Sequence, residues 1–308
     1  MAEEIQVEIV LAAYQGEHFI REQVDSILKQ SDSRWHLTVS DDGSTDQTLQ
    51  ILDEYAARYP GKISRYRAPQ RFGCARDHFF HLMRQVNAPL MMFSDQDDTW
   101  YPDKVKRMLE AAEDAQGDAN TPLLVFSDQT PTDASLHPLA PSLMRYQQQA
   151  IEGFDYRSIL MQNVVTGGAM MINRALAELG GQCVRPLDVI MHDWWLAAVA
   201  ARFGHIIYID EPLGTYRQHG KNSVGAKDVG SVRHVMEKLS HLKTLRETIL
   251  QKKQQAQVFL DTYEASLSQG EAAFLKGFAK ARSGPAFYWR NRQWIHGFWR
   301  LAGAMCLG

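Results

Sequence analysis

The feature that most constrains the fold is an alternation of apolar, β-rich runs with segments whose apolar residues recur at helical spacing. The β-rich runs cover residues 5–13, 35–40, 62–67, 89–94 and 123–127, and the amphipathic segments cover residues 17–30, 44–56, 74–86 and 102–112. This alternation predicts the α/β class, with a mainly parallel sheet and helices on both faces. Such sheets bind ligands at the carboxyl ends of their strands, so the loops after the strands are the candidate site.

The second half of the 308-residue chain is less regular. Apolar spacing predicts two helices and two strands there, over residues 155–162, 191–202, 205–209 and 213–217. The proline-containing residues 131–141 are typical of a loop, and from about Asp228 the sequence becomes helical and polar. We therefore expect a main domain over residues 1–227 and a helical C-terminal extension over residues 228–308.

Composition limits the cellular compartment and the kinds of ligand that we expect. A net charge of -3 argues against a nucleic-acid ligand, and 45% hydrophobic residues with 22% charged residues are ordinary for a globular protein. Cys74, Cys183 and Cys306 are scattered, which favours a reducing compartment over a disulfide framework. The acidic start does not resemble a signal peptide, and no apolar run approaches the ~20 residues of a membrane span. These features predict a cytoplasmic protein.

The first polar loop, residues 40–44, follows a predicted strand and contains Asp42. A carboxylate at this place could accept a hydrogen bond from a nucleobase N–H or a ribose hydroxyl. Equally, Asp, Gly and Ser form turns and cap helices without any ligand. Ser44 and Gln47 have the spacing of a capping box, so we expect a helix to begin there.

The second loop is more acidic, with Asp95, Asp97 and Asp98 within four positions after an apolar strand. Carboxylates this close repel one another, so they need a cation or hydrogen-bond donors nearby. Mg²⁺ and Mn²⁺ take carboxylate oxygens and complete their coordination with phosphate and water. A divalent metal here could bridge the diphosphate of a nucleotide-sugar, although a solvated acidic turn is the simpler alternative.

Two further segments carry polar groups that suit catalysis or binding. Asp193, at a predicted helix start beside Trp194, could act as a general base whose pKa is raised by apolar neighbours. Alternatively it caps the helix, with core tryptophans beside it. Arg217 and His219 could bind phosphate oxygens, and His219 could also ligate a metal.

Taken in order, these motifs resemble the inverting glycosyltransferases of family two, which have the GT-A fold. The resemblance covers roughly residues 5–225 and is carried by residues 11–16, residues 40–46, residues 94–98 and His192-Asp193. It implies that residues 1–227 form a GT-A catalytic domain, a Rossmann-like nucleotide-diphospho-sugar transferase domain. One loop has Gln15 where the family more often has Asn, and the Gln-x-x-Arg-Trp motif of processive synthases is absent, so we expect one sugar per encounter.

The resemblance also implies a role for each candidate residue. Asp42 takes the place of the aspartate that contacts the nucleobase, and Asp193 that of the catalytic base. Asp95 and Asp97 correspond to the two acids of the DxD motif, with Asp97 foremost as the direct metal ligand. The remaining residues implied in substrate binding are Ala13, Tyr14, Asp95, Trp194, Arg217 and His219.

Within the family, residues 93–104 and residues 216–223 are similar to rhamnosyltransferases of bacterial O-antigen and cell-wall polysaccharide assembly. This similarity implies dTDP-L-rhamnose as the donor and a lipid-linked glycan as the acceptor, with a UDP- or GDP-sugar donor as the alternative. A sugar-1-phosphate nucleotidyltransferase would need a glycine-rich, arginine-containing loop after the first strand, which residues 13–16 do not supply. A non-catalytic scaffold of a polysaccharide assembly complex would not need such complete acidic motifs.

The C-terminal tail, residues 276–308, is basic and aromatic and contains no Asp or Glu. Aromatic residues mixed with arginine suit the interface of an anionic membrane, where a lipid-linked acceptor would lie. We therefore predict peripheral membrane contact, with packing against the catalytic domain or a second subunit as the alternative. The polar stretch from Asp228 to Gln269 could instead mediate homodimer formation.

Overall fold

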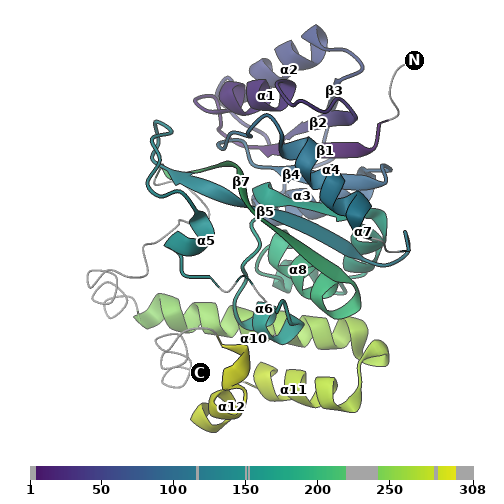
Figure 1. The fold of residues 1–308 in the computed structure, drawn as a ribbon, viewed down its shortest axis with the longest axis vertical. Helices are drawn as coiled ribbons and strands as arrows, with labels where there is room; N and C mark the ends of the chain where they lie inside the picture. The colour runs from purple at the N-terminus through teal and green to yellow at the C-terminus, as the bar shows by residue number, and fades with distance from the viewer. Residues whose placement is uncertain are drawn as a thin grey trace.

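The computed structural model describes residues 5–115, 118–149, 151, 153–219, 242–280 and 284–295. Its centre is a seven-stranded sheet with the strand order β3-β2-β1-β4-β6-β5-β7 (Figure 1). The strands are β1 (Val7–Ala13), β2 (Trp35–Asp41), β3 (Ile63–Tyr66), β4 (Leu90–Ser94), β5 (Leu123–Thr132), β6 (Met170–Asn173) and β7 (His205–Arg217). Only β6 runs antiparallel to its neighbours, β4 and β5, so the expected mainly parallel sheet is confirmed.

Strand register brings the polar loops to one edge of the sheet. Ala13 at the end of β1 pairs with Asp41 at the end of β2, and Leu11 pairs with Ser94 at the end of β4. The loops that leave these three parallel strands therefore begin side by side.

Helices cover both faces of the sheet, as expected. The α-helices are α1 (Ile20–Leu28), α2 (Thr48–Arg58), α3 (Ala75–Gln85), α4 (Lys104–Asp114), α5 (Leu143–Tyr146), α6 (Tyr156–Met161), α7 (Arg174–Gly180), α8 (His192–Phe203), α10 (Leu242–Tyr263), α11 (Gln269–Ala279) and α12 (Gly284–Arg290). Because neighbouring strand residues point to opposite faces, Ile9 and Met92 join one core with α1, α2 and α4. Val10 and Phe93 join the other core with α3, α7 and α8.

Two strands are longer than predicted. The two short strands expected over residues 205–209 and 213–217 form the single strand β7, and β5 continues into the expected loop as far as Thr132. Pro212 lies where the register between β5 and β7 shifts, opposite Asp128. A register shift tolerates the missing proline N–H, so the proline does not end the strand.

The expected capping box at Ser44 does not form. The Ser44 hydroxyl donates to Asp41 and accepts from the backbone N–H of Gln15. Helix α2 begins at Thr48, where the backbone N–H donates to the carboxylate of Asp46 at 3.0 Å. The capping spacing was misread because Ser44 is needed to hold the loop after β1.

The described helices of the C-terminal extension pack onto the rest of the protein. Figure 1 shows α10 running beneath α6 and α8, with α11 and α12 on its far side. Phe259 of α10 lies 5.6 Å from Trp195 of α8, measured between ring centroids, and both side chains are fully buried. Residues 228–241, which include the predicted domain boundary, lie outside the described residues. Among the helices that the structure describes, none is long and apolar enough to cross a membrane.

Part of the aromatic tail also packs inward. Tyr288 is buried, the ring of Phe287 stacks on that of Phe278 at 5.9 Å, and the Arg157 guanidinium lies 3.8 Å from the Trp294 ring. Trp289 on the same helix is 55% exposed. The tail beyond Ile295 is not described.

Candidate active site

The loops at the carboxyl edge of the sheet enclose a cavity of about 690 Å³. Its walls come from the loops after β1, β2 and β4, the 3₁₀ turn η1 (Gly167–Ala169), the start of α8 and the end of β7. The structure thus brings together predicted site residues from distant parts of the sequence: Ala13, Tyr14, Asp42, Asp95, Asp97, Asp193, Trp194 and His219.

The loop after β1 is held against the loop after β4. The Tyr14 N–H donates to Gln96 Oε1 at 2.8 Å, and Gln96 Nε2 donates to the Tyr14 carbonyl at 2.9 Å. A Cβ atom on Gly16 would lie 2.3 Å from Gln96 Oε1, so a larger residue here would displace the Gln96 amide from these two hydrogen bonds. Sequence reasoning missed Gln96, although its place between Asp95 and Asp97 already located it in the site.

Asp42 lies at the end of the β2 strand with its side chain buried. Its carboxylate accepts hydrogen bonds from the backbone N–H groups of Phe72 at 2.5 Å and Gly73 at 2.7 Å. Gly73 also lines the cavity, so Asp42 shapes the wall on which a nucleobase would lie. Each carboxylate oxygen has a second acceptor site, and the predicted contact with a base stays a prediction.

Asp95 and Asp98 form a cluster with Lys104, the first residue of α4; Asp98 and Lys104 are buried, and Asp95 is partly buried at the cavity wall. The Lys104 ammonium donates to the Gly168 carbonyl. A Cβ atom on Gly168 would lie 3.1 Å from Asp95 Oδ2 and 3.3 Å from Asp98 Oδ2. Burial raises the pKa of both carboxyls and lowers that of Lys104, while the opposite charges favour its protonated form.

This cluster links the acidic loop to the turn η1 through Lys104. Sequence reasoning did not assign Lys104 a role. One signal was available, because a cation in the first turn of a helix opposes the helix dipole and needs a nearby acid.

Asp97 and His219 meet at the cavity wall. His219 Nε2 lies 2.6 Å from Asp97 Oδ2, and the imidazole stacks on Phe19 with 4.7 Å between centroids. A carboxylate and an imidazole in this arrangement fit a divalent cation that takes its remaining ligands from phosphate and water. No group of three or more His, Cys, Asp or Glu side chains in the described ranges is arranged as a complete metal site. A cation would therefore depend on the ligand to fill its coordination.

Asp193 is the second residue of α8 and also lines the cavity. Its Oδ2 accepts from the Gly167 N–H at 3.0 Å, and its Oδ1 accepts from the Trp194 N–H at 2.6 Å. The N-cap of α8 is Met191, so Asp193 does not have the capping role considered as its alternative. Burial raises the pKa of Asp193 to about 6. A carboxylate of this kind is ionised at neutral pH and is a stronger base than an exposed one.

The neighbours of Asp193 have different environments. The His192 ring lies between Phe79 and Phe93, and burial lowers its pKa to about 3, so the ring is neutral. The Trp194 indole donates to the Ile159 carbonyl, and its half-buried ring lines the cavity. Trp195 is fully buried in the core. Only the fold distinguishes the tryptophan of the site from that of the core.

Arg217 is the predicted residue that the structure does not bring to the cavity. Its guanidinium is buried, pairs with Glu22 and lies 4.8 Å from the Phe19 ring. Its backbone N–H donates to Asp98 at 2.9 Å. Because the side chain is held on α1, Arg217 supports the acidic loop from behind in this structure, and direct phosphate binding stays a prediction.

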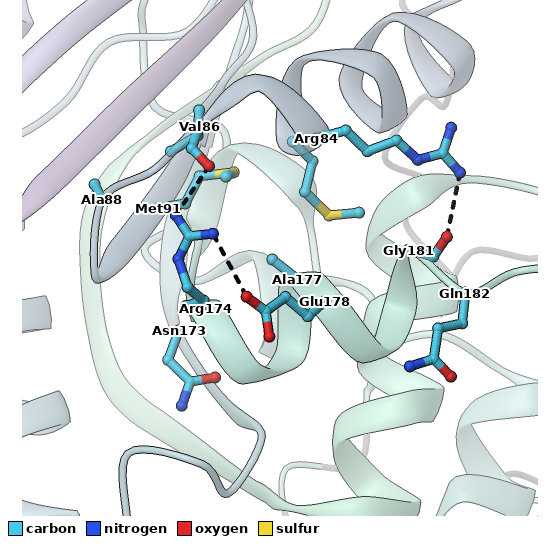
Figure 2. A pocket seen from close by; sticks show the side chains of 11 residues that line it. Arg84, Val86, Ala88, Met91, Asn173, Arg174, Ala177, Glu178, Gly181 and Gln182 are labelled. Carbon is cyan, nitrogen blue, oxygen red and sulfur yellow. Dashed lines mark hydrogen bonds and ion pairs between the residues drawn. The ribbon is translucent and has the colours of Figure 1, made fainter.

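A second, smaller cavity of about 280 Å³ lies at the other end of β4 and β6, and Figure 2 shows its lining. Arg174 donates to the Val86 carbonyl and lies 3.5 Å from Glu178, and Arg84 donates to the Gly181 carbonyl. These polar groups bind the protein itself, and none of the predicted site residues is among them.

Comparison with known proteins shows a family match and relatives that are similar in sequence. The profile described as Glycosyl transferase family 2 matches residues 8–180, more than half of the chain. The dTDP-rhamnosyl transferase RfbG of Shigella flexneri is 31% identical over 230 residues, which cover 70% of this chain and 74% of RfbG. The UDP-Glc:alpha-D-GlcNAc-diphosphoundecaprenol beta-1,3-glucosyltransferase WfgD of Escherichia coli is 28% identical over 104 residues, or 33% of this chain and 39% of WfgD.

Solved structures share the fold at low identity. S. aureus TarS 1-349 in complex with UDP-GlcNAc has a TM-score of 0.56 at 16% identity, covering 94% of this chain and 80% of that chain. The mannosyltransferase PcManGT from Pyrobaculum calidifontis, in complex with GDP-Man and Mn²⁺, has a TM-score of 0.54 at 17% identity, covering 99% of this chain and 87% of that chain.

Proposed function

We propose a reaction for this chain from one premise: the chain belongs to glycosyl transferase family 2, has the GT-A fold and is a nucleotide-sugar-dependent glycosyltransferase. We infer that it transfers L-rhamnose from dTDP-L-rhamnose to a hydroxyl of a lipid-linked glycan in the synthesis of a bacterial surface polysaccharide. Similarity to RfbG supports the donor, and the diphosphoundecaprenol-linked acceptor in the name of WfgD supports a lipid-linked acceptor.

The cavity walls suggest where the donor binds. Ala13, Tyr14 and Asp42 line the part beside β1 and β2, and we assign the nucleoside to it. The diphosphate would then lie at Asp97 and His219, the side chains that would hold Mg²⁺ or Mn²⁺. Asp95 supplies a further carboxylate next to this position. The bound metal would stabilise the negative charge that develops on the departing nucleoside diphosphate.

The reaction is a single in-line displacement. The acceptor oxygen attacks the anomeric carbon while the bond from that carbon to the diphosphate oxygen breaks, so the configuration inverts. Asp193 accepts the proton of the attacking hydroxyl, and the Gly167 and Trp194 N–H groups hold its carboxylate in place. The observation that carries this proposal is that Asp193 and the Asp97–His219 pair line one cavity, so a base and a leaving-group site share it.

A donor screen tests the proposal. Purified protein is incubated with dTDP-L-rhamnose and with UDP- and GDP-sugars, each with Mg²⁺, Mn²⁺ or EDTA, and nucleotide release is measured. We expect metal-dependent release of dTDP above that of UDP or GDP. Preferential release of UDP would instead support a glucosyltransferase similar to WfgD, and a lack of release with metal-independent binding would favour a scaffold.

The location of the protein follows from its proposed acceptor. A lipid-linked glycan presents its sugar at the membrane surface, so we propose peripheral attachment at the cytoplasmic face. The exposed Trp289, with the Arg292 guanidinium 4.8 Å from its ring, is the described part of the tail that suits this contact.

A further inference from the structure

We propose that one side of the active-site cavity is a subsite for an uncharged pyranose, the terminal sugar of the acceptor. This inference rests on the proposed glycosyl transfer and adds the class of group that accepts the sugar. Three glutamines carry it, Gln147, Gln149 and Gln162, and together they are called the amide wall. All three line the cavity, and Gln147 and Gln162 are the residues that end α5 and α6. Figure 1 shows α5, α6 and α10 on the opposite side of β5 and β7 from β1 and β2.

The amide wall is a connected chain of hydrogen bonds. Gln162 Nε2 donates to Gln149 Oε1, and Gln149 Nε2 donates to Gln147 Oε1 at 3.1 Å. Gln162 Oε1 is buried and has no hydrogen-bond partner among the described residues. A buried acceptor without a donor is unfavourable by about 1–3 kcal/mol, so the chain is incomplete as it stands. A sugar hydroxyl both donates and accepts, and a turn of the Gln162 amide toward the cavity would let it complete the chain.

The neighbouring Asn163 differs from the glutamines because both ends of its side-chain amide bind the protein backbone. It is therefore a structural group and not a binding group. Asn163 donates to the Val165 carbonyl and accepts from the Val165 N–H at 3.0 Å. Both ends of its amide thus hold the segment that leads to η1. We leave Asn163 out of the subsite for this reason.

Trp194 supplies an apolar surface beside the amide wall. Its indole N–H is bound to the Ile159 carbonyl, which fixes the plane of the ring, and the ring lines the cavity. Aromatic faces pack well against the C–H groups of a pyranose. Because Asp193 and Trp194 line the same cavity, a sugar packed on this ring would present its hydroxyls toward the space that the proposed base also faces.

The charge on this side of the cavity argues for a neutral sugar. The lining residues between Leu143 and Lys252 that the structure describes are amides, apolar groups and hydroxyls, apart from the neutral His192, the base Asp193, His219, which pairs with Asp97, and Lys252. The Lys252 ammonium lies 5.5 Å from the Trp194 ring centroid. The negative charge of Asp193 and the positive charge of Lys252 cancel, so no net charge favours an anionic sugar. The carboxylate of such a sugar would also be repelled by Asp193.

Binding of octyl glycosides tests the subsite without using the donor. Full-length protein with dTDP and Mg²⁺ is titrated with octyl glucoside, octyl N-acetylglucosaminide and octyl glucuronide, and Kd is measured by saturation-transfer NMR. We expect an uncharged glycoside to bind at least about tenfold more tightly than the glucuronide. Loss of one amide contact in Gln149→Met or Gln162→Met should raise its Kd by about 2–13-fold.

Two further variants sharpen the test. Trp194→Leu removes the aromatic face without touching the amides and should weaken binding as well. Gln251→Met changes an exposed glutamine on α10 beside Lys252 and should leave Kd unchanged. Thermal melts confirm that each variant is folded.

The possible failures are distinguishable. Tighter binding of the glucuronide, no glycoside binding at all, or unchanged Kd in both glutamine variants would overturn the amide wall. Absence of nucleotide release from every donor in the separate screen would instead count against the proposed reaction.

Discussion

Among single residues, the Asp193 carboxylate has the environment that most directly predicts a measurable property. Burial raises its pKa to about 6, and the base must be deprotonated to accept a proton. Activity should therefore fall as the pH drops through about 6, whereas an aspartate at its ordinary pKa of 3.8 would keep its activity to about pH 4. The pH dependence of kcat/KM for nucleotide release measures this.

The matched variant is Asp193→Asn, which keeps the shape of the side chain but cannot accept the proton. We expect kcat to fall by about 10²–10⁴-fold, with a thermal melt near that of the wild type. Turnover close to wild type in this variant would remove Asp193 from the role of base.

Asp97 and His219 lead to a prediction about metal binding. In the wild type, Mn²⁺ should raise the affinity for dTDP by at least about tenfold. Asp97→Ala or His219→Ala should remove this increase, because each side chain is a proposed ligand. Isothermal titration with and without Mn²⁺ gives the comparison. Asp210→Ala, which removes an exposed carboxylate that pairs with Arg145, is the control. An unchanged response to Mn²⁺ in both site variants would contradict the assignment.

Among elements, the contact between α4 and η1 connects the acidic loop to the base. Lys104 is 1% exposed, faces Asp95 and Asp98, and holds the Gly168 carbonyl. The backbone N–H of the preceding residue, Gly167, donates to the carboxylate of Asp193. The position of the base therefore depends on a lysine that does not reach the substrate.

Lys104→Met should reveal this dependence. The buried Asp98 and the partly buried Asp95 would lose their cation, so the free energy of unfolding should fall by about 3–5 kcal/mol, as measured by urea denaturation. Lys106→Met, at an exposed position of the same helix, should change it by less than about 0.5 kcal/mol. Equal stability of the two variants would show that Lys104 does not neutralise the cluster.

For the whole molecule, the C-terminal helices share a core with the catalytic half. Phe259 of α10 contacts the rings of Trp195, Phe203 and Tyr263 at 5.0–6.2 Å between centroids. Phe259→Ala should lower the free energy of unfolding by about 3–5 kcal/mol, because it leaves a cavity in this core. Leu250→Ala, at an exposed position on the same helix, should have a much smaller effect. A separate unfolding transition of α10 at lower denaturant would argue against one cooperative unit.

Membrane attachment is also a property of the whole molecule. Tyr288 and Trp294 pack inward, so of the described tail the exposed Trp289 and its neighbour Arg292 are the groups that could enter a lipid interface. The full-length protein should co-sediment with anionic vesicles, less so at high salt, and Trp289→Glu should reduce the bound fraction several-fold. Negligible binding by both proteins would end this hypothesis.

The α/β class, most strand and helix positions and the acidic loops could be predicted from the sequence, because apolar periodicity and turn residues act over a few neighbouring positions. The long-range pairs required the tertiary structure: Asp97 and His219 are 122 positions apart. The tertiary structure was also needed to show that Trp194 lines the site while Trp195 lies in the core. The same holds for the pairing of Arg217 with Glu22 and for the three glutamines that form one wall. Burial and contact depend on which distant segment arrives beside a residue, and local spacing carries no information about that.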